Sequence, residues 1–146
     1  MKQDYSPDDA YRIIDANFNR AKEGLRVCED IARFYLKSSV TTAAIASLRH
    51  SLTLAIKQSP IDPKKLIRAR DIAADPGKTS VLGPTRGSYK AIFIANAQRV
   101  KEALRVLEEF SKLFDANLSR RLQRLRFRFY DHEKKVFGRF PALLDP

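Results

Sequence analysis

The sequence predicts an all-α fold, a helical bundle of two tandem repeated helical hairpins joined by a loop that contains glycine and proline. Three observations predict it. A motif occurs twice, apolar residues recur with helical spacing between capping signals, and the alternation typical of β-strands is absent apart from short ambiguous runs. The length of 146 residues is typical of one domain, so we expect a single helical domain over 1–146.

The motif lies at residues 17–30 and again at residues 96–109. Eight of its fourteen positions are identical between the two copies, where average composition would give about one. The repeat predicts two similar halves, one over about 6–58 and one over about 88–138, separated by a loop at about 59–88 and followed by a short C-terminal tail.

The first half begins with a strong helix start. Ser6 can cap the helix, and the proline and two aspartates that follow it suit the first helical turn. We expect this helix to extend to about residue 37. A second helix is expected over about 41–58, with its apolar residues on one face, and Asp62 can cap a short helix that ends near residue 67.

The second half follows a segment of different character. Residues 68–88 contain glycine and proline and show no periodicity, which predicts a long loop that is either functional or disordered. A third helix is expected over about 88–114. Asp115 can cap a fourth helix that stops at Gly138, and the tail over 139–146 is expected to be irregular.

The formal net charge of +11 favours anionic partners such as nucleotides, phosphorylated metabolites, nucleic acid or an acidic membrane surface, and it does not choose among them. No apolar run approaches the roughly 20 residues that a membrane span needs, and the N-terminus is too acidic for a signal peptide. The single cysteine, Cys28, is compatible with a reducing cytosol and aligns with Leu107 in the repeat, which favours a core position. We therefore expect a cytoplasmic protein without a membrane partner. An exposed apolar face on the motif helix would favour a two-fold homodimer.

The motif places polar residues beside small and apolar ones. At 100° per residue, Asn17 and Arg20 share the apolar face of the first copy, and Asn96 and Arg99 share that of the second. This pattern predicts an internal anion pocket shared by the two hairpins, with the loop as its lid. The alternative is a structural buried network. Glu23 and Glu102 lie at the boundary of this face. The remaining charged residues of the first copy are expected to form a series of solvent-exposed ion pairs one turn apart: Lys22, Arg26, Glu29 and Arg33.

The loop contains a second cluster of charged residues. Asp71 and Asp75 are interleaved with basic residues, including Arg70 and Arg86, which suits a Mg²⁺-phosphate site. The run from Gly77 to residue 79 resembles the end of a P-loop, but the upstream glycine and the preceding strand are missing. The alternative is a disordered linker.

Two further signals are ambiguous. The fourth helix is strongly basic and carries Phe127, Phe129 and Tyr130, a pattern of a nucleic-acid stripe or, more often, of a core face. His50 follows Arg49 on the second helix, where a lone histidine is either structural or a donor to a ligand.

Residues 15–34 read Asp-Ala-Asn-Phe-Asn-Arg-Ala-Lys-Glu-Gly-Leu-Arg-Val-Cys-Glu-Asp-Ile-Ala-Arg-Phe. This run resembles the opening signature of an all-helical family of bacterial thiamine biosynthesis, the monofunctional hydroxymethylpyrimidine-phosphate kinases. The resemblance covers about residues 10–135 and includes the second motif copy, the Leu-Arg-His run at 48–50 and the Arg-Asp…Asp-x-Gly…Arg pattern of the loop. Members of this family often occur fused ahead of thiamine-phosphate synthase, which implies a functional link to that enzyme.

The resemblance implies that ATP converts 4-amino-5-hydroxymethyl-2-methylpyrimidine phosphate to its diphosphate, with Mg²⁺. It implies catalytic roles, with Arg20 and Arg99 on phosphates and Asp71 and Asp75 on Mg²⁺, the latter with Glu23 or Glu102. The remaining residues implied for substrate and phosphate binding are Asn17, Arg49, His50, Arg70, Gly77, Arg86 and Asn96.

Three other functions compete with this one. A different helical-bundle enzyme, such as a chorismate-mutase-like isomerase, would also bind an anionic substrate through arginines. A basic nucleic-acid-binding module would use the net positive charge, and its affinity would fall steeply with salt. A regulatory domain would bind a thiamine intermediate without turnover. The resemblance makes nucleic acid the less favoured partner.

Overall fold

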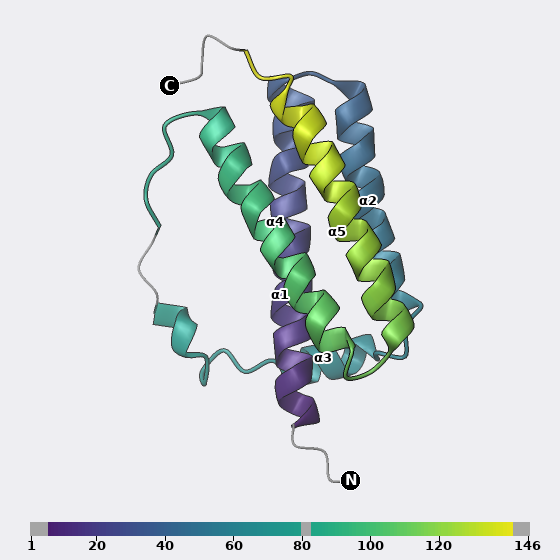
Figure 1. The fold of residues 1–146 in the computed structure, drawn as a ribbon. Helices are drawn as coiled ribbons and strands as arrows, with labels where there is room; N and C mark the ends of the chain where they lie inside the picture. The colour runs from purple at the N-terminus through teal and green to yellow at the C-terminus, as the bar shows by residue number, and fades with distance from the viewer. Residues whose placement is uncertain (1–5, 80–82, 142–146) are drawn as a thin grey trace.

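The computed structural model describes residues 6–79 and 83–141, and it contains helices and no strand within those ranges (Figure 1). The expected all-α fold is therefore confirmed. The elements are α1 (Pro7–Asp30), a π-helical turn η1 (Ile31–Tyr35), α2 (Ser39–Lys57), α3 (Pro63–Ala69), a 3-10 turn η2 (Pro76–Thr79), α4 (Tyr89–Ser111) and α5 (Ala116–Phe137).

The four long helices form a bundle in which each half contributes a hairpin, α1 with α2 and α4 with α5. The hairpins join through contacts of α1 with α4 and of α2 with α5, and α1 and α4 run in opposite directions (Figure 1). The short helix α3 packs against α1. Aliphatic side chains dominate the core, together with Phe93 and Phe129, and both copies of the motif contribute to it. The arrangement brings the two motif helices face to face.

The capping residues and periodicity of the sequence predicted most helix ends correctly. Asp62 and Ser88 cap α3 and α4 by accepting hydrogen bonds from backbone N–H groups at 2.9 Å and 3.0 Å. The expectation that Ser6 caps α1 is wrong, because its side chain makes no capping hydrogen bond. The helix α4 ends at Ser111 instead of residue 114, in a run of turns before the Asp115 cap. Of the expected irregular tail, residues 142–146 lie outside the described part of the chain.

The aromatic and cysteine positions divide between core and surface. Cys28 has no exposed surface, as expected for a core residue. Burial raises the pKa of its thiol to about 12, and the charge of Glu133 adds to the effect. Of the three aromatic residues named on α5, Phe129 is in the core, whereas Phe127 and Tyr130 are exposed. The core interpretation is therefore wrong for Phe127 and Tyr130. No helix in the described ranges is both long and apolar enough to cross a membrane.

Each hairpin is linked by a buried ion pair, and the two pairs occupy equivalent places in the repeat. Glu29 of α1 accepts a hydrogen bond from Arg49 of α2 at 3.2 Å. In the second half, Glu108 of α4 accepts one from Arg126 of α5 at 2.9 Å. Both glutamates are 5% exposed. The expectation that Glu29 belongs to a series of solvent-exposed ion pairs is therefore wrong, because α2 covers this side of α1.

The Glu29 pair predicts an acid-sensitive component of stability. Burial by itself raises the pKa of this carboxyl, but hydrogen bonds from Arg26 and Arg49 outweigh burial and hold the pKa below its usual range. A lowered folded-state pKa stabilises the fold above the unfolded-state pKa of about 4.3, and this stability is lost as the pH falls through the folded value. Urea titrations measure the free energy of unfolding of the wild type and of Glu29→Gln. We expect the difference between the two values to decrease below about pH 4.3. A difference that stays constant down to pH 2 would contradict this assignment.

Candidate functional site

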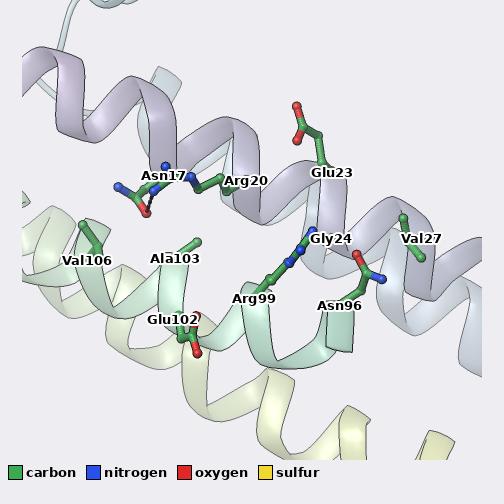
Figure 2. Close-up of a pocket in the computed structure, with 10 residues that line it drawn as sticks. All are labelled: Asn17, Arg20, Glu23, Gly24, Val27, Asn96, Arg99, Glu102, Ala103 and Val106. Atoms are coloured by element: carbon green, nitrogen blue, oxygen red, sulfur yellow. Dashed lines mark hydrogen bonds between the residues drawn. The ribbon is translucent and has the colours of Figure 1, made fainter. Parts of the chain in front are cut away.

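A surface cavity of about 540 Å³, which we call the central cavity, lies where α1 crosses α4 (Figure 2). Five residues of α1 and five of α4 line it, and each α1 residue has its counterpart 79 positions later on α4. The pairs are Asn17 and Asn96, Arg20 and Arg99, Glu23 and Glu102, Gly24 and Ala103, and Val27 and Val106. The cavity is thus built by equivalent positions of the repeat, with approximate two-fold symmetry.

A glycine lets the two motif helices approach closely at this crossing. A Cβ atom added at Gly24 would lie 2.8 Å from Cγ2 of Val100 and 3.1 Å from the carbonyl oxygen of Asn96. Both neighbours belong to α4, so the close approach of the helices depends on the missing side chain. The fold consequently fixes the distance between the two walls of the central cavity.

This close approach carries a stability prediction. We expect Gly24→Val to lower the free energy of unfolding by about 1–3 kcal/mol, because the larger side chain forces α1 and α4 apart. Urea denaturation measures the change. Gly138→Val is the matched control, since a Cβ there meets nothing closer than 3.6 Å. Equal losses in both variants would show that the close approach of α1 and α4 at Gly24 is not responsible.

The two asparagines hold equivalent positions through the same hydrogen bond. Nδ2 of Asn17 donates to the carbonyl oxygen of Ile13 at 2.9 Å, and Nδ2 of Asn96 donates to that of Ile92 at 2.8 Å. Each amide keeps a carbonyl oxygen and a second N–H for other partners. Both residues line the central cavity, so each wall offers one amide with donor and acceptor capacity.

The two arginines have most of their donors available. Nη1 of Arg20 lies 3.5 Å from Oδ1 of Asn17, a long contact drawn in Figure 2. Arg99 makes no hydrogen bond or ion pair with any residue in the described ranges. Both side chains are exposed, so the expectation of an internal pocket is corrected to an open cavity at the surface. Two guanidinium groups without carboxylate partners suit the binding of phosphate oxygens.

A second cavity of about 400 Å³, the loop cavity, lies between α1 and the segment that follows α3. Its lining includes Asp71 and Asp75, and it shares Asn17 and Arg20 with the central cavity. The structure thus brings both aspartates expected in the site to the arginine of the first motif copy. The lining is completed by Asp9, Arg12, Ile13, Asp15, Ala16, Arg70 and Ile72.

A bidentate ion pair holds this part of the loop against α1. Nε and Nη2 of Arg70 donate to the two carboxylate oxygens of Asp15, each at 2.8 Å. Arg12 donates to the backbone carbonyl of Asp71 at 3.2 Å. The side chain of Asp15 is 9% exposed and that of Arg70 is 45% exposed, so the ion pair is partly buried. These hydrogen bonds to Asp15 and Arg12 of α1 therefore position the segment around residue 71 at the edge of the cavity.

Four of the expected site residues line neither cavity. Arg49 is engaged with Glu29, and Arg86 donates to the carbonyl oxygen of Pro84 at 2.9 Å in the exposed part of the loop. The backbone N–H of Gly77 donates to Asp75 at 2.7 Å, and His50 is exposed on α2. Of the loop that was expected to form a lid, residues 80–82 lie outside the described part of the chain.

The sequence analysis did not identify two residues that line the central cavity, Val27 and Val106. A signal for them was present. Residues 17, 20, 24 and 27 follow the spacing i, i+3, i+7 and i+10, which places them in one row along a helix, and the same row recurs in the second copy. The missed residues of the loop cavity, Asp9 and Arg12, had no such signal, because they have no equivalents in the repeat that carry charge.

The carboxylates fit Mg²⁺ only in combination with a phosphate ligand. In residues 6–79 and 83–141, no three His, Cys, Asp or Glu side chains are grouped closely enough to hold a metal ion by themselves. Mg²⁺ is commonly bound by one or two carboxylates together with substrate phosphates and water. Two pairs of residues can supply these one or two carboxylates: Glu23 and Glu102 in the central cavity, and Asp71 and Asp75 in the loop cavity.

The fold and the site together define a duplicated all-helical domain with one cavity between its two motif helices. The chain belongs to the ThiD2 family, whose model matches residues 12–135. No solved structure matches the chain.

Several relatives of this chain carry the name thiamine-phosphate synthase. The protein from Nostoc punctiforme is 40% identical over 131 residues, which cover 88% of this chain and 35% of the relative. The protein from Synechocystis sp. is 38% identical over 138 residues, or 93% of this chain and 38% of the relative. The chain spans little more than a third of the length of these curated relatives. The comparisons support a place in thiamine biosynthesis, and none of these names states a kinase activity.

Proposed function

We propose that this protein transfers the terminal phosphoryl group of ATP to 4-amino-5-hydroxymethyl-2-methylpyrimidine phosphate and so forms the diphosphate. One observation carries the proposal, the central cavity with an equivalent arginine on each wall. A transfer between two phosphorylated molecules brings together two anions that repel each other, and two cationic walls offset that repulsion. The family match and the names of the relatives support thiamine biosynthesis as the setting.

The proposed reaction needs few catalytic groups. An oxygen of the pyrimidine phosphate attacks the γ-phosphorus of ATP, the bond from that phosphorus to the β–γ bridging oxygen breaks, and ADP leaves with the electron pair. The second pKa of a phosphate monoester is about 6, so the attacking oxygen is mostly ionised at neutral pH and requires no strong base. Alignment of the substrates and neutralisation of charge are the main tasks.

The residues of the two cavities can perform these tasks. Arg20 and Arg99 offer bidentate donors to phosphate oxygens. Asn17 and Asn96 offer an amide on each wall for the aminopyrimidine or a phosphate. When bound, Mg²⁺ would neutralise charge on the phosphates, and the candidates to hold it are Glu23, Glu102, Asp71 and Asp75.

A coupled assay of ADP release tests the proposal. We expect ADP release only when ATP, Mg²⁺ and the pyrimidine phosphate are all present, with a stoichiometric amount of pyrimidine diphosphate detected by phosphorus NMR. Binding of the pyrimidine phosphate without ADP release would indicate a regulatory domain instead. Absence of the diphosphate at micromolar protein would contradict the proposed reaction.

A further inference from the structure

The repeat makes Arg20 and Arg99 equivalent within the central cavity, but the rest of the structure does not. Arg20 lines both the central cavity and the loop cavity. Arg99 lines the central cavity and is not part of the loop-cavity lining. The loop, which has no counterpart in the repeat, therefore extends the site on one side only, next to the first motif copy.

The sequence shows why the second motif copy lacks this extension. The loop cavity depends on Asp15, which anchors the loop through Arg70, and on Arg12, which binds the backbone of residue 71. The positions equivalent to Arg12 and Asp15 on α4 are Ala91 and Ile94. Neither can form an ion pair or donate from a side chain, so the second half cannot anchor a loop in the same way.

Two residues, Asn17 and Arg20, line both cavities, and only one of them carries a charge. Asn17 already donates to the carbonyl oxygen of Ile13 at 2.9 Å, which fixes its amide. Among the described residues, Arg20 has only the long hydrogen bond of 3.5 Å to Asn17, so most of its donors remain available to a ligand on either side. The junction of the two cavities thus has one cationic side chain.

We propose that one substrate of the phosphoryl transfer occupies each cavity and that Arg20 contacts the group in transfer, whereas Arg99 binds only the substrate in the central cavity. This proposal rests on the proposed function. An in-line transfer places the moving phosphoryl group between donor and acceptor, as the new oxygen–phosphorus bond forms and the bond to the ADP oxygen breaks. The cation at the junction meets charge that develops in the transition state. Arg99, which does not line the loop cavity, instead meets charge that its substrate carries both in the bound ground state and in the transition state.

The two roles differ in kinetics. An interaction made mainly in the transition state changes kcat, whereas one made equally with the bound substrate and the transition state changes KM. Arg20 is therefore assigned as a catalytic residue and Arg99 as a binding residue, although they are identical in type and related by the repeat.

Matched lysine variants test this assignment. Arg20→Lys and Arg99→Lys keep the charge but lose the planar, bidentate fork of donors. We expect Arg20→Lys to lower kcat by about 100-fold with both KM values changed less than about threefold. We expect Arg99→Lys to raise the KM of one substrate by about tenfold or more, with kcat and the other KM nearly unchanged. Arg124→Lys, an exposed position on α5 that lines neither cavity, is the control.

Calorimetric titration gives a readout that does not depend on turnover. A non-hydrolysable ATP analogue with Mg²⁺ and the pyrimidine phosphate are each titrated into the wild type and both variants. We expect Arg99→Lys to weaken the binding of one of these ligands and not the other, and Arg20→Lys to weaken both by less than about threefold. Equal losses of kcat in the two lysine variants, or equal weakening of both ligands by Arg99→Lys, would overturn the assignment while leaving the proposed reaction intact. A wild type that forms no diphosphate would overturn both.

Discussion

Replacing Arg20 by alanine is expected to lower kcat for diphosphate formation by about a thousandfold, or about 4 kcal/mol in activation free energy. Arginines that neutralise a phosphoryl group in transfer commonly contribute at least that much. The effect on folding is expected to be negligible. The side chain is exposed, and its one hydrogen bond within the described ranges is the 3.5 Å approach to Asn17. Steady-state kinetics and a thermal melt of the same sample separate the two effects.

The control for this variant is Arg124→Ala, which removes an exposed arginine from α5 outside both cavities. It has the same change in net charge, so it reports the general effect of charge on substrate attraction. We expect its kcat to remain within about twofold of the wild type. An Arg20→Ala variant that keeps more than a tenth of wild-type kcat would show that the cavity at the α1–α4 crossing is not the site of transfer.

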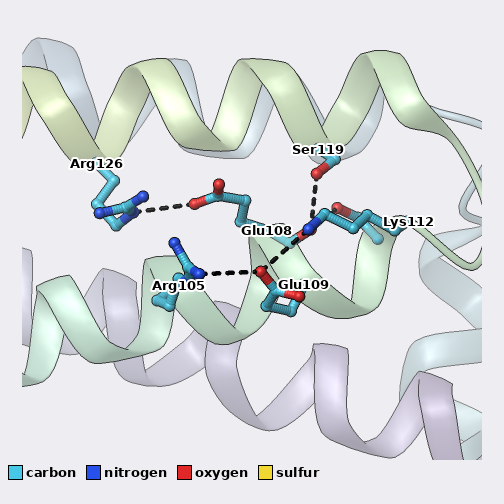
Figure 3. A network of polar contacts seen from close by, with 7 residues as sticks. Arg105, Glu108, Glu109, Lys112, Ser119 and Arg126 are labelled. Carbon is cyan, nitrogen blue, oxygen red and sulfur yellow. Dashed lines mark hydrogen bonds and ion pairs between the residues drawn. The ribbon is translucent and has the colours of Figure 1, made fainter.

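The second large effect concerns stability. Glu108→Ala is expected to lower the free energy of unfolding by about 3 kcal/mol, because it leaves the guanidinium of Arg126 buried without its partner. The ion pair joins α4 to α5 (Figure 3), with 2.9 Å between Nε of Arg126 and Oε2 of Glu108, and both side chains are largely buried. The backbone carbonyl of Glu108 also accepts a hydrogen bond from Ser119 of α5 at 2.8 Å. Urea unfolding followed by circular dichroism measures the loss.

The neighbouring residue supplies a matched control. Glu109 forms ion pairs with Arg105 and Lys112 (Figure 3), at 3.3 Å and 3.1 Å, but its side chain is 43% exposed. Ion pairs of this exposed kind contribute little, so Glu109→Ala is expected to leave stability nearly unchanged. The double variant Glu108→Leu with Arg126→Met should recover most of the loss, because it removes both buried charges. If Glu109→Ala lowers the free energy of unfolding as much as Glu108→Ala does, burial of the ion pair is not the cause of the loss.

The helices were predictable because their signals are local. Caps such as Asp62, Ser88 and Asp115 lie beside the residues they cap, and apolar periodicity is read within a few turns. The motif repeat also predicted that Arg20 and Arg99 share one cavity, which the structure confirms. It could not predict that both side chains are exposed, because exposure depends on how close the two helices approach at Gly24.

Other predictions failed where a distant segment decides the outcome. A helical wheel placed Glu29 on the outer side of α1, yet α2 covers that side and supplies Arg49 as a partner. Arg49 is therefore engaged with Glu29 and lines neither cavity, although the family resemblance implied a role in substrate and phosphate binding. The loop offered no periodicity, and its placement depends on the pair between Arg70 and Asp15, which are far apart in the sequence.

The sequence by itself determined the helices, the duplication and the polar residue types that each motif copy offers, because capping and periodicity act over neighbouring residues. The tertiary structure alone decided which of these residues meet. The crossing at Gly24 forms the central cavity, and the anchor at Asp15 brings Asp71 to one side of it. Equivalent arginines thereby acquire different surroundings, because burial and contact are set by helices and loops that pack together from distant parts of the chain.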